Sequence, residues 1–167
     1  MRVTSKGIVD GKILDVYGAR GTEFNPNGMP TYSLPFLVED APENTVSYAL
    51  ILEDKDAYPV SGGFVWIHWL AANITRCELL ENESQSAADF VQGQNSWTSI
   101  QGGEQNAQLS SYYGGMTPPD RPHMYELHVF ALDTMLDLKN GFLLNELWWQ
   151  MEEHILDRFT LKGLYDN

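Results

Sequence analysis

Residues 110–133 read SSYYGGMTPPDRPHMYELHVFALD, and this stretch decides both the fold and the expected site. A Gly-Gly turn and a Pro-Pro pair lead into His123, which begins an apolar, strand-like segment. The prolines of this approach stiffen the backbone, and such rigidity matters where a side chain must be positioned. Alternation along the strand places His123 and Tyr125 on one face and His128 on the other. We therefore expect a rigid loop at the mouth of a pocket, with His123 and Tyr125 beside it.

The composition is that of a single globular domain covering residues 1–167. Hydrophobic residues make up 43% of the chain and charged residues 20%, which suits a chain that buries a sizeable core. The net charge of -13 argues against nucleic acids and anionic membranes, but a locally positive pocket could still hold one small anion. Cys77 is the only cysteine, so no intramolecular disulfide is expected. No signal peptide or membrane span is visible, and we expect a cytoplasmic protein.

Two further segments have the length and composition of buried strands. Residues 46–52 form a nearly continuous apolar run, and the carboxylates Asp54 and Asp56 follow its end. Residues 64–74 form the second run, with His68 as the one ionisable group in its middle. Regular alternation divides this strand into one face with Phe64, Trp66, His68, Leu70 and Ala72 and another with Val65, Ile67, Trp69 and Ala71.

The rest of the chain predicts further short strands and one late helix. Asp10-Gly11 indicates a hairpin, and Pro35 favours an edge strand over residues 34–38. Residues 75–111 are polar and irregular, and excursions of this length in a compact domain tend to carry function. A helix with its N-cap at Asn145, followed by a short strand, is predicted from apolar residues at helical spacing: Leu144, Leu147, Trp148, Met151 and Ile155. The fold class is therefore mainly β, a β-sandwich with a peripheral C-terminal helix.

Each candidate side chain also has an ordinary structural explanation. Two carboxylates after a strand often only cap a turn, and a histidine in a proline-rich turn is usually just exposed. A buried histidine is more often a satisfied core residue than a ligand, although His68 between tryptophans needs a defined partner. Gly114-Gly115 could offer backbone N–H groups to an anion, and a plain tight turn explains the pair equally well. The sequence contains no phosphate-binding glycine loop and no nucleophile elbow.

Two long motifs resemble the phosphatidylethanolamine-binding protein family, which includes Raf kinase inhibitor protein, and above all its short bacterial and archaeal members. Residues 49–57 (ALILEDKDA) and 65–74 (VWIHWLAANI) are similar to the family's D-P-D-A-P segment and W-x-H-x-x-x-x-N-I/M strand. Residues 93–96 (GQNS), 113–119 (YGGMTPP) and 123–125 (HMY) are similar to its G-x-N, Y-x-G-P-x-P-P and H-R-Y elements. Because both motifs occur in the right order, the resemblance is specific, and it covers most of the chain.

The resemblance implies a sandwich of two antiparallel sheets with a small pocket for phosphoryl groups at one end. It implies that this pocket is formed by Asp54, His68, Pro118, Pro119, His123 and Tyr125, with Trp66, Asp56 and Gly114 beside them. The chain departs from the family at Lys55, Tyr58 and Gly115, where prolines are usual. Met124 replaces the arginine of H-R-Y, so we expect Asp56 to have lost a cationic partner.

These features lead to the hypothesis of a binding protein that needs no cofactor. A phosphate or phosphomonoester would accept hydrogen bonds from His68, His123 and Tyr125. The resemblance also implies that the protein could regulate a protein partner such as a kinase, as a monomer or homodimer. Two alternatives stay open: a hydrolase or lyase that uses His and Asp as acid and base, and a metal site formed by Asp54, His68 and His123.

Overall fold

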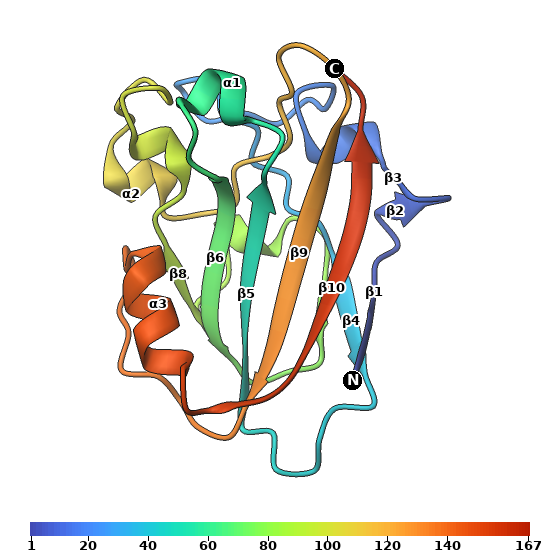
Figure 1. Ribbon diagram of the computed structural model, residues 1–167, viewed down its shortest axis with the longest axis vertical. Helices are drawn as coiled ribbons and strands as arrows, with labels where there is room; N and C mark the ends of the chain where they lie inside the picture. The colour runs from blue at the N-terminus through green and yellow to red at the C-terminus, as the bar shows by residue number, and fades with distance from the viewer.

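A computed structural model describes all 167 residues, and its strands form two sheets (Figure 1). The larger sheet has the strand order β2-β3-β10-β9-β5-β6-β8. Its strands are Ile8–Val9 (β2), Lys12–Ile13 (β3), Ile155–Tyr165 (β10), His123–Leu132 (β9), Ser47–Asp54 (β5), Trp66–Ile74 (β6) and Val91–Gly93 (β8). The smaller sheet has the order β1-β4-β7, with the strands Arg2–Thr4 (β1), Phe36–Glu39 (β4) and Glu78–Leu79 (β7).

The helical elements are short and lie at the periphery of the large sheet (Figure 1). The α-helices are Tyr58–Ser61 (α1), Ala107–Ser110 (α2) and Leu144–Met151 (α3), and the 3-10 turns are Asp15–Tyr17 (η1), Glu83–Gln85 (η2) and Ser96–Thr98 (η3). No helix has the length and apolar character that crossing a membrane would require.

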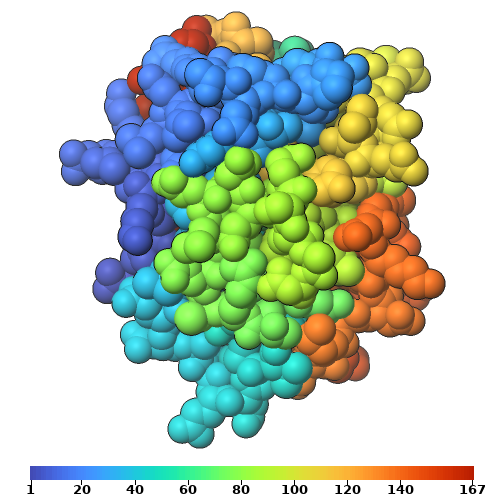
Figure 2. Space-filling model, turned by 180° about the vertical axis from the view of Figure 1, so that it is seen from behind, coloured from blue at the N-terminus to red at the C-terminus, as the bar shows by residue number.

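The two sheets enclose the main core, which confirms the predicted β-sandwich. Apolar side chains of the large sheet pack there against those of the small sheet: Leu50, Leu52, Trp69, Leu127 and Val129 against Val3, Phe36, Val38 and Leu79. Figure 2 shows the molecule from behind, where N-terminal segments in blue and residues after β6 in green cover much of the surface. The other face of the large sheet forms a second core with α3, in which Leu147 and Met151 are fully buried.

The C-terminal part of the chain differs from the prediction. The helix ends at Met151, and Ile155 begins β10, an eleven-residue strand rather than a short one. The N-cap is Leu143, not Asn145, and the Leu143 amide donates to the Glu146 carboxylate at 2.7 Å. The helical spacing wrongly included Ile155 in the helix. This residue belongs to β10, which pairs with β9 along its whole length, and this pairing outweighs a local pattern.

Of two predictions about hairpins and edge strands, the structure confirms one and contradicts the other. The hairpin at Asp10-Gly11 is confirmed: β2 pairs with β3, and both turn residues have positive φ, 50° and 77°. The edge strand is wrong, because β4 lies between β1 and β7. Pro35 precedes the strand, which begins at Phe36, so its missing N–H costs no ladder hydrogen bond. The large sheet is antiparallel except for one parallel pairing, between β10 and β3.

A β-bulge in β6 changes which side chains face the sandwich core. Leu52 pairs with Trp69 and Glu53 pairs with Ile67, so His68 is an extra residue on its strand. The predicted alternation is therefore wrong beyond this point: Trp69 and Ala71 enter the sandwich core, whereas Leu70 and Ala72 face α3. Bulges are common beside functional sites, because they redirect one side chain without ending the strand.

Candidate functional site

The candidate site lies at the end of the large sheet where β5 ends and both β6 and β9 begin, near α1 (Figure 1). The strand register places Asp54 opposite Trp66 on one side and opposite Tyr125 on the other. The bulge turns His68 towards the same place, and the rings of His68 and Tyr125 lie 5.1 Å apart between their centres. Three strands thus bring together residues that are far apart in the sequence.

A cavity of about 270 Å³ opens here, of a size that suits a small ligand. Five of the nine predicted site residues line it: Asp54, Trp66, His68, Pro119 and Tyr125. The other lining residues were not predicted, and they are Asn27, Ala57, Val60, Trp97, Gln101, Gly102, Gln105 and Thr117.

The remaining predicted residues do not line the cavity. Pro118 is buried, and Gly114 packs under Trp97, where an added Cβ would come within 2.6 Å of the indole ring. The His123 side chain has no exposed surface, and its ring centre lies 6.4 Å from that of Tyr125. Asp56 faces the loop before β9 instead of the cavity.

Asp54 and His123 form a buried pair that fixes the carboxylate of the cavity wall. The two nitrogens of His123 lie 2.7 Å from Asp54 Oδ2 and 2.8 Å from Asp120 Oδ1. Both oxygens are acceptors, so both bonds require a fully protonated ring or one protonated carboxyl group. The second oxygen of Asp54 accepts the Asp56 backbone N–H at 2.8 Å. Asp54 is therefore engaged on both oxygens, and His123 has no free nitrogen for a ligand.

Asp56 has a cationic partner, contrary to the expectation drawn from Met124. The Arg121 guanidinium lies 3.5 Å from Asp56 Oδ1, and the backbone N–H of Met124 donates to Oδ2 at 3.0 Å. The sequence prediction failed because Arg121, two residues before His123, reaches the carboxylate from the preceding loop. The exposed side chains of Arg121 and Asp56 make this a weak contact.

His68 has one ring nitrogen fixed by the protein and one free. Nδ1 lies 2.7 Å from the carbonyl oxygen of Gly114, so this nitrogen carries the hydrogen. Burial lowers the pKa of His68 below its usual value, and the nearby Asp54 carboxylate offsets only part of this effect. The ring is thus neutral near pH 7, and its Nε2 can accept a hydrogen bond in the cavity.

Tyr125 carries a buried hydroxyl group whose hydrogen has no acceptor within the protein, although the backbone N–H of Thr117 approaches its oxygen. The side chain is 1% exposed and lines the cavity beside His68. Burial raises the pKa of Tyr125 far above its usual value, so the phenol keeps its proton. Buried polar groups without a partner are rare and costly, and this one is available as a donor beside the His68 acceptor.

Trp97 is the main residue that sequence reasoning missed. It lies in η3, and its indole ring packs edge-on against Trp66 at 5.3 Å and His68 at 5.2 Å. The Asn95 side chain accepts the Trp97 backbone N–H and so fixes the start of the turn. Residues 75–111 were expected to carry function, but nothing in their pattern distinguished Trp97 from other scattered apolar residues.

The metal alternative at Asp54, His68 and His123 is not supported by the geometry. Only one group of three His, Cys, Asp or Glu side chains brings its ligand atoms within 4.8 Å of one another, and it consists of Glu53, Glu126 and His128. His123 is instead fully occupied by two carboxylates.

Comparisons with known proteins agree on one family. The family profile described as Phosphatidylethanolamine-binding protein matches residues 4–166. YxkA of Bacillus subtilis is 44% identical over 145 residues, covering 85% of this chain and 86% of its own. A UPF0098 protein of Chlamydia muridarum is 31% identical and covers 99% of both chains. The crystal structure of the PEBP homologue CT736 from Chlamydia trachomatis, 28% identical, superimposes with a TM-score of 0.79 over 99% of this chain and 96% of its own. The chain belongs to the phosphatidylethanolamine-binding protein family, as its motifs predicted.

Proposed function

We propose that the cavity binds the phosphoryl group of a small phosphomonoester. The observation that carries this proposal is the buried Tyr125 hydroxyl group, whose hydrogen has no acceptor in the protein, on a ring whose centre lies 5.1 Å from that of His68 in the wall of the same cavity. A phosphoryl group with one remaining proton is complementary to this pair. Its charged oxygen accepts from Tyr125, and its P–OH group donates to His68.

The surroundings favour a monoester over a larger anion. Asp54 would repel an anion, but both of its oxygens are already hydrogen-bonded, and the His123 ring lies against it. The cavity wall also contains Trp66, Trp97 and Val60, which would contact a small organic substituent. His123 holds Asp54 in place and does not touch the ligand, which revises the ligand-binding role predicted for His123 from the sequence.

The first test is Tyr125→Phe, with phenyl phosphate as the ligand and calorimetry as the measurement. Removing one hydrogen bond to a charged group is expected to weaken binding by about 10- to 100-fold, from 1.5–3 kcal/mol at about 1.4 kcal/mol per factor of ten. The free energy of unfolding should stay equal or rise slightly, because the variant removes an unpaired buried hydroxyl group.

The matched control is Tyr48→Phe, which removes a hydroxyl group in the same core at the other end of β5. Tyr48→Phe should leave the affinity for phenyl phosphate unchanged. Equal affinity of the Tyr125→Phe variant and the parent protein would overturn the proposal. Release of phenol from phenyl phosphate, lost in His68→Gln, would support the hydrolase alternative instead.

Binding of phenyl phosphate is expected to weaken as the pH rises from about 7 to about 8.5. The pKa of His68 is lowered in the free protein, and the second pKa of a phosphomonoester is about 6. Above pH 7 the free phosphomonoester is therefore a dianion and the free His68 ring is neutral. The complex contains one proton more, shared between the phosphoryl group and His68, and binding must take this proton up from solution. The dissociation constant should then rise about tenfold per pH unit, as proton linkage requires.

His68→Gln provides the control for this pH dependence. The glutamine amide can donate an N–H to the dianionic phosphoryl group, so the complex need not take up a proton and the pH profile should be nearly flat over the same range. A parent protein whose dissociation constant is constant between pH 7 and pH 8.5 would contradict the shared proton.

Regulation of a protein partner such as a kinase, a cytoplasmic location, and a monomeric or homodimeric state stay predictions from the sequence. Affinity purification from separated cell fractions and size-exclusion chromatography with light scattering would measure them.

A further inference from the structure

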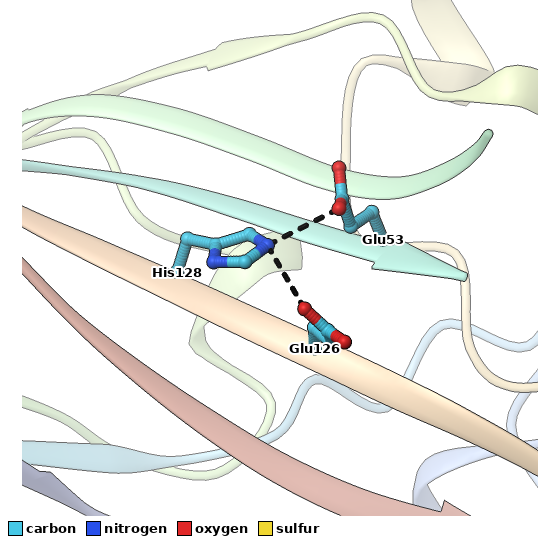
Figure 3. Close-up of side chains that lie close together, drawn as sticks. All are labelled: Glu53, Glu126 and His128. Atoms are coloured by element: carbon cyan, nitrogen blue, oxygen red, sulfur yellow. Dashed lines mark hydrogen bonds and ion pairs between the residues drawn. The ribbon is translucent and has the colours of Figure 1, made fainter. Parts of the chain in front are cut away.

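A second cluster of ligand-type side chains lies on β5 and β9 (Figure 3), on the face of the large sheet opposite to the cavity residues Asp54 and Tyr125. It consists of Glu53 on β5 with Glu126 and His128 on β9, and the sheet register pairs Glu53 with Glu126. The side chains are partly buried, with 16%, 14% and 20% of their surfaces exposed. Their nearest ligand atoms all lie within 4.8 Å of one another.

The two distances from His128 to the carboxylates are close to the spacing of neighbouring ligands around a tetrahedral ion. His128 Nε2 lies 3.2 Å from Glu53 Oε1 and 3.7 Å from Glu126 Oε2 (Figure 3). Zinc bonds of about 2.0–2.2 Å to nitrogen and oxygen place neighbouring ligand atoms about 3.3–3.5 Å apart. The other ring nitrogen of His128 is held by Thr160 Oγ1 at 2.8 Å, so Nε2 is directed at the carboxylates.

A cation already occupies the position between the two carboxylates. The Lys55 ammonium lies 3.2 Å from Glu53 Oε1 and 2.8 Å from Glu126 Oε2, the same two oxygens that face His128. The Lys162 ammonium binds the other oxygen of Glu126, Oε1, at 2.9 Å and does not contact Oε2. The Lys55 side chain is 55% exposed, so it can move into solvent when another cation takes its place.

We propose that Glu53, Glu126 and His128 form a site for a divalent transition metal of the zinc type, with Lys55 as its competitor. One imidazole and two carboxylates fill three corners of a tetrahedron, and water would fill the fourth. The imidazole favours a transition metal over calcium or magnesium, which prefer six or more oxygen ligands.

The ion would connect β5 and β9 directly behind the cavity. Glu53 and Glu126 are the chain neighbours of Asp54 and Tyr125, whose side chains point to the opposite face. Metal binding is therefore expected to raise the melting temperature, because the ion binds the folded arrangement of the two strands.

The experiment is a titration of EDTA-dialysed protein with Zn²⁺ by calorimetry, repeated with Co²⁺ by visible absorption. The parent protein should bind one ion, and the Co²⁺ complex should show the strong visible bands of four-coordination. His128→Gln should weaken binding by more than about tenfold, because it removes the nitrogen ligand. Lys55→Met should tighten binding, because it frees both carboxylate oxygens.

The matched control is His154→Gln, which alters a histidine that pairs with the exposed carboxylate of Asp133 elsewhere on the surface. It should bind Zn²⁺ as the parent protein does. The proposal is overturned if His128→Gln and the parent protein bind equally well. It is also overturned if neither the parent protein nor Lys55→Met binds one equivalent of Zn²⁺.

Discussion

His123→Ala is expected to lower the free energy of unfolding by about 3–5 kcal/mol, the typical cost of leaving a buried carboxyl group without its hydrogen-bonding partner. His123 is fully buried and Asp54 is 2% exposed, so the remaining carboxylate would recover only part of its hydration, through the cavity that it lines. It would keep only the hydrogen bond from the Asp56 backbone N–H. Urea unfolding at pH 7 measures the loss, with the slope of the transition as a check that unfolding stays two-state.

His154→Ala is the matched control for this prediction. His154 also pairs with an aspartate, Asp133, at 2.8 Å, but the two side chains are 46% and 43% exposed. A pair of this kind contributes about 1 kcal/mol or less. If His123→Ala cost no more than His154→Ala, the buried pair would not hold the cavity wall together. A double variant, Asp54→Ala with His123→Ala, should lose less than the sum of the single variants, because neither partner is left alone.

The strands that carry the cavity could be predicted because each has a strong local signal. The apolar runs that became β5 and β6, and the alternation along β9, identify buried strands without any tertiary information. They also place Asp54 at the end of one strand and His68 inside the next. β10 was underestimated because its partner, β9, determines its length, and pairing between distant segments leaves little trace in a local pattern.

The details of the site depended on features that periodicity does not contain. One inserted residue in β6 turns both His68 and Trp69 towards the sandwich core, and its position is set by pairing with β5. The residues before β9 bring Asp120 against His123, which takes that ring away from the cavity. Glu126 and His128 were assigned no role, because their partner Glu53 lies on another strand and the register was unknown.

Trp69→Ala is expected to destabilise the fold by about 3–5 kcal/mol, because it empties a fully enclosed part of the sandwich core. The side chain is 1% exposed, and its ring packs edge-on against Tyr113 at 5.5 Å. Its indole N–H donates to Gln92 Oε1 at 2.8 Å, and the Ser84 hydroxyl group donates to the same oxygen at 2.6 Å. Trp69→Phe keeps most of the ring and loses this one bond, so it should cost clearly less. Urea unfolding compares the two variants.

Trp149→Ala is the matched control, because it removes a side chain of the same size from an exposed position. Trp149 lies on α3 and is 83% exposed, so its removal should change the free energy of unfolding by no more than about 0.5 kcal/mol. The comparison also tests the bulge, because regular alternation would have turned Trp69 away from the face that His68 shares. The buried indole N–H of Trp69 is tolerated because Gln92 accepts its hydrogen bond. The Gln92 amide N–H in turn donates to the Ser84 carbonyl oxygen at 2.8 Å, so the buried polar groups of Gln92 all have partners. A cost for Trp69→Ala close to that of Trp149→Ala would contradict both the burial and the inward direction of this side chain.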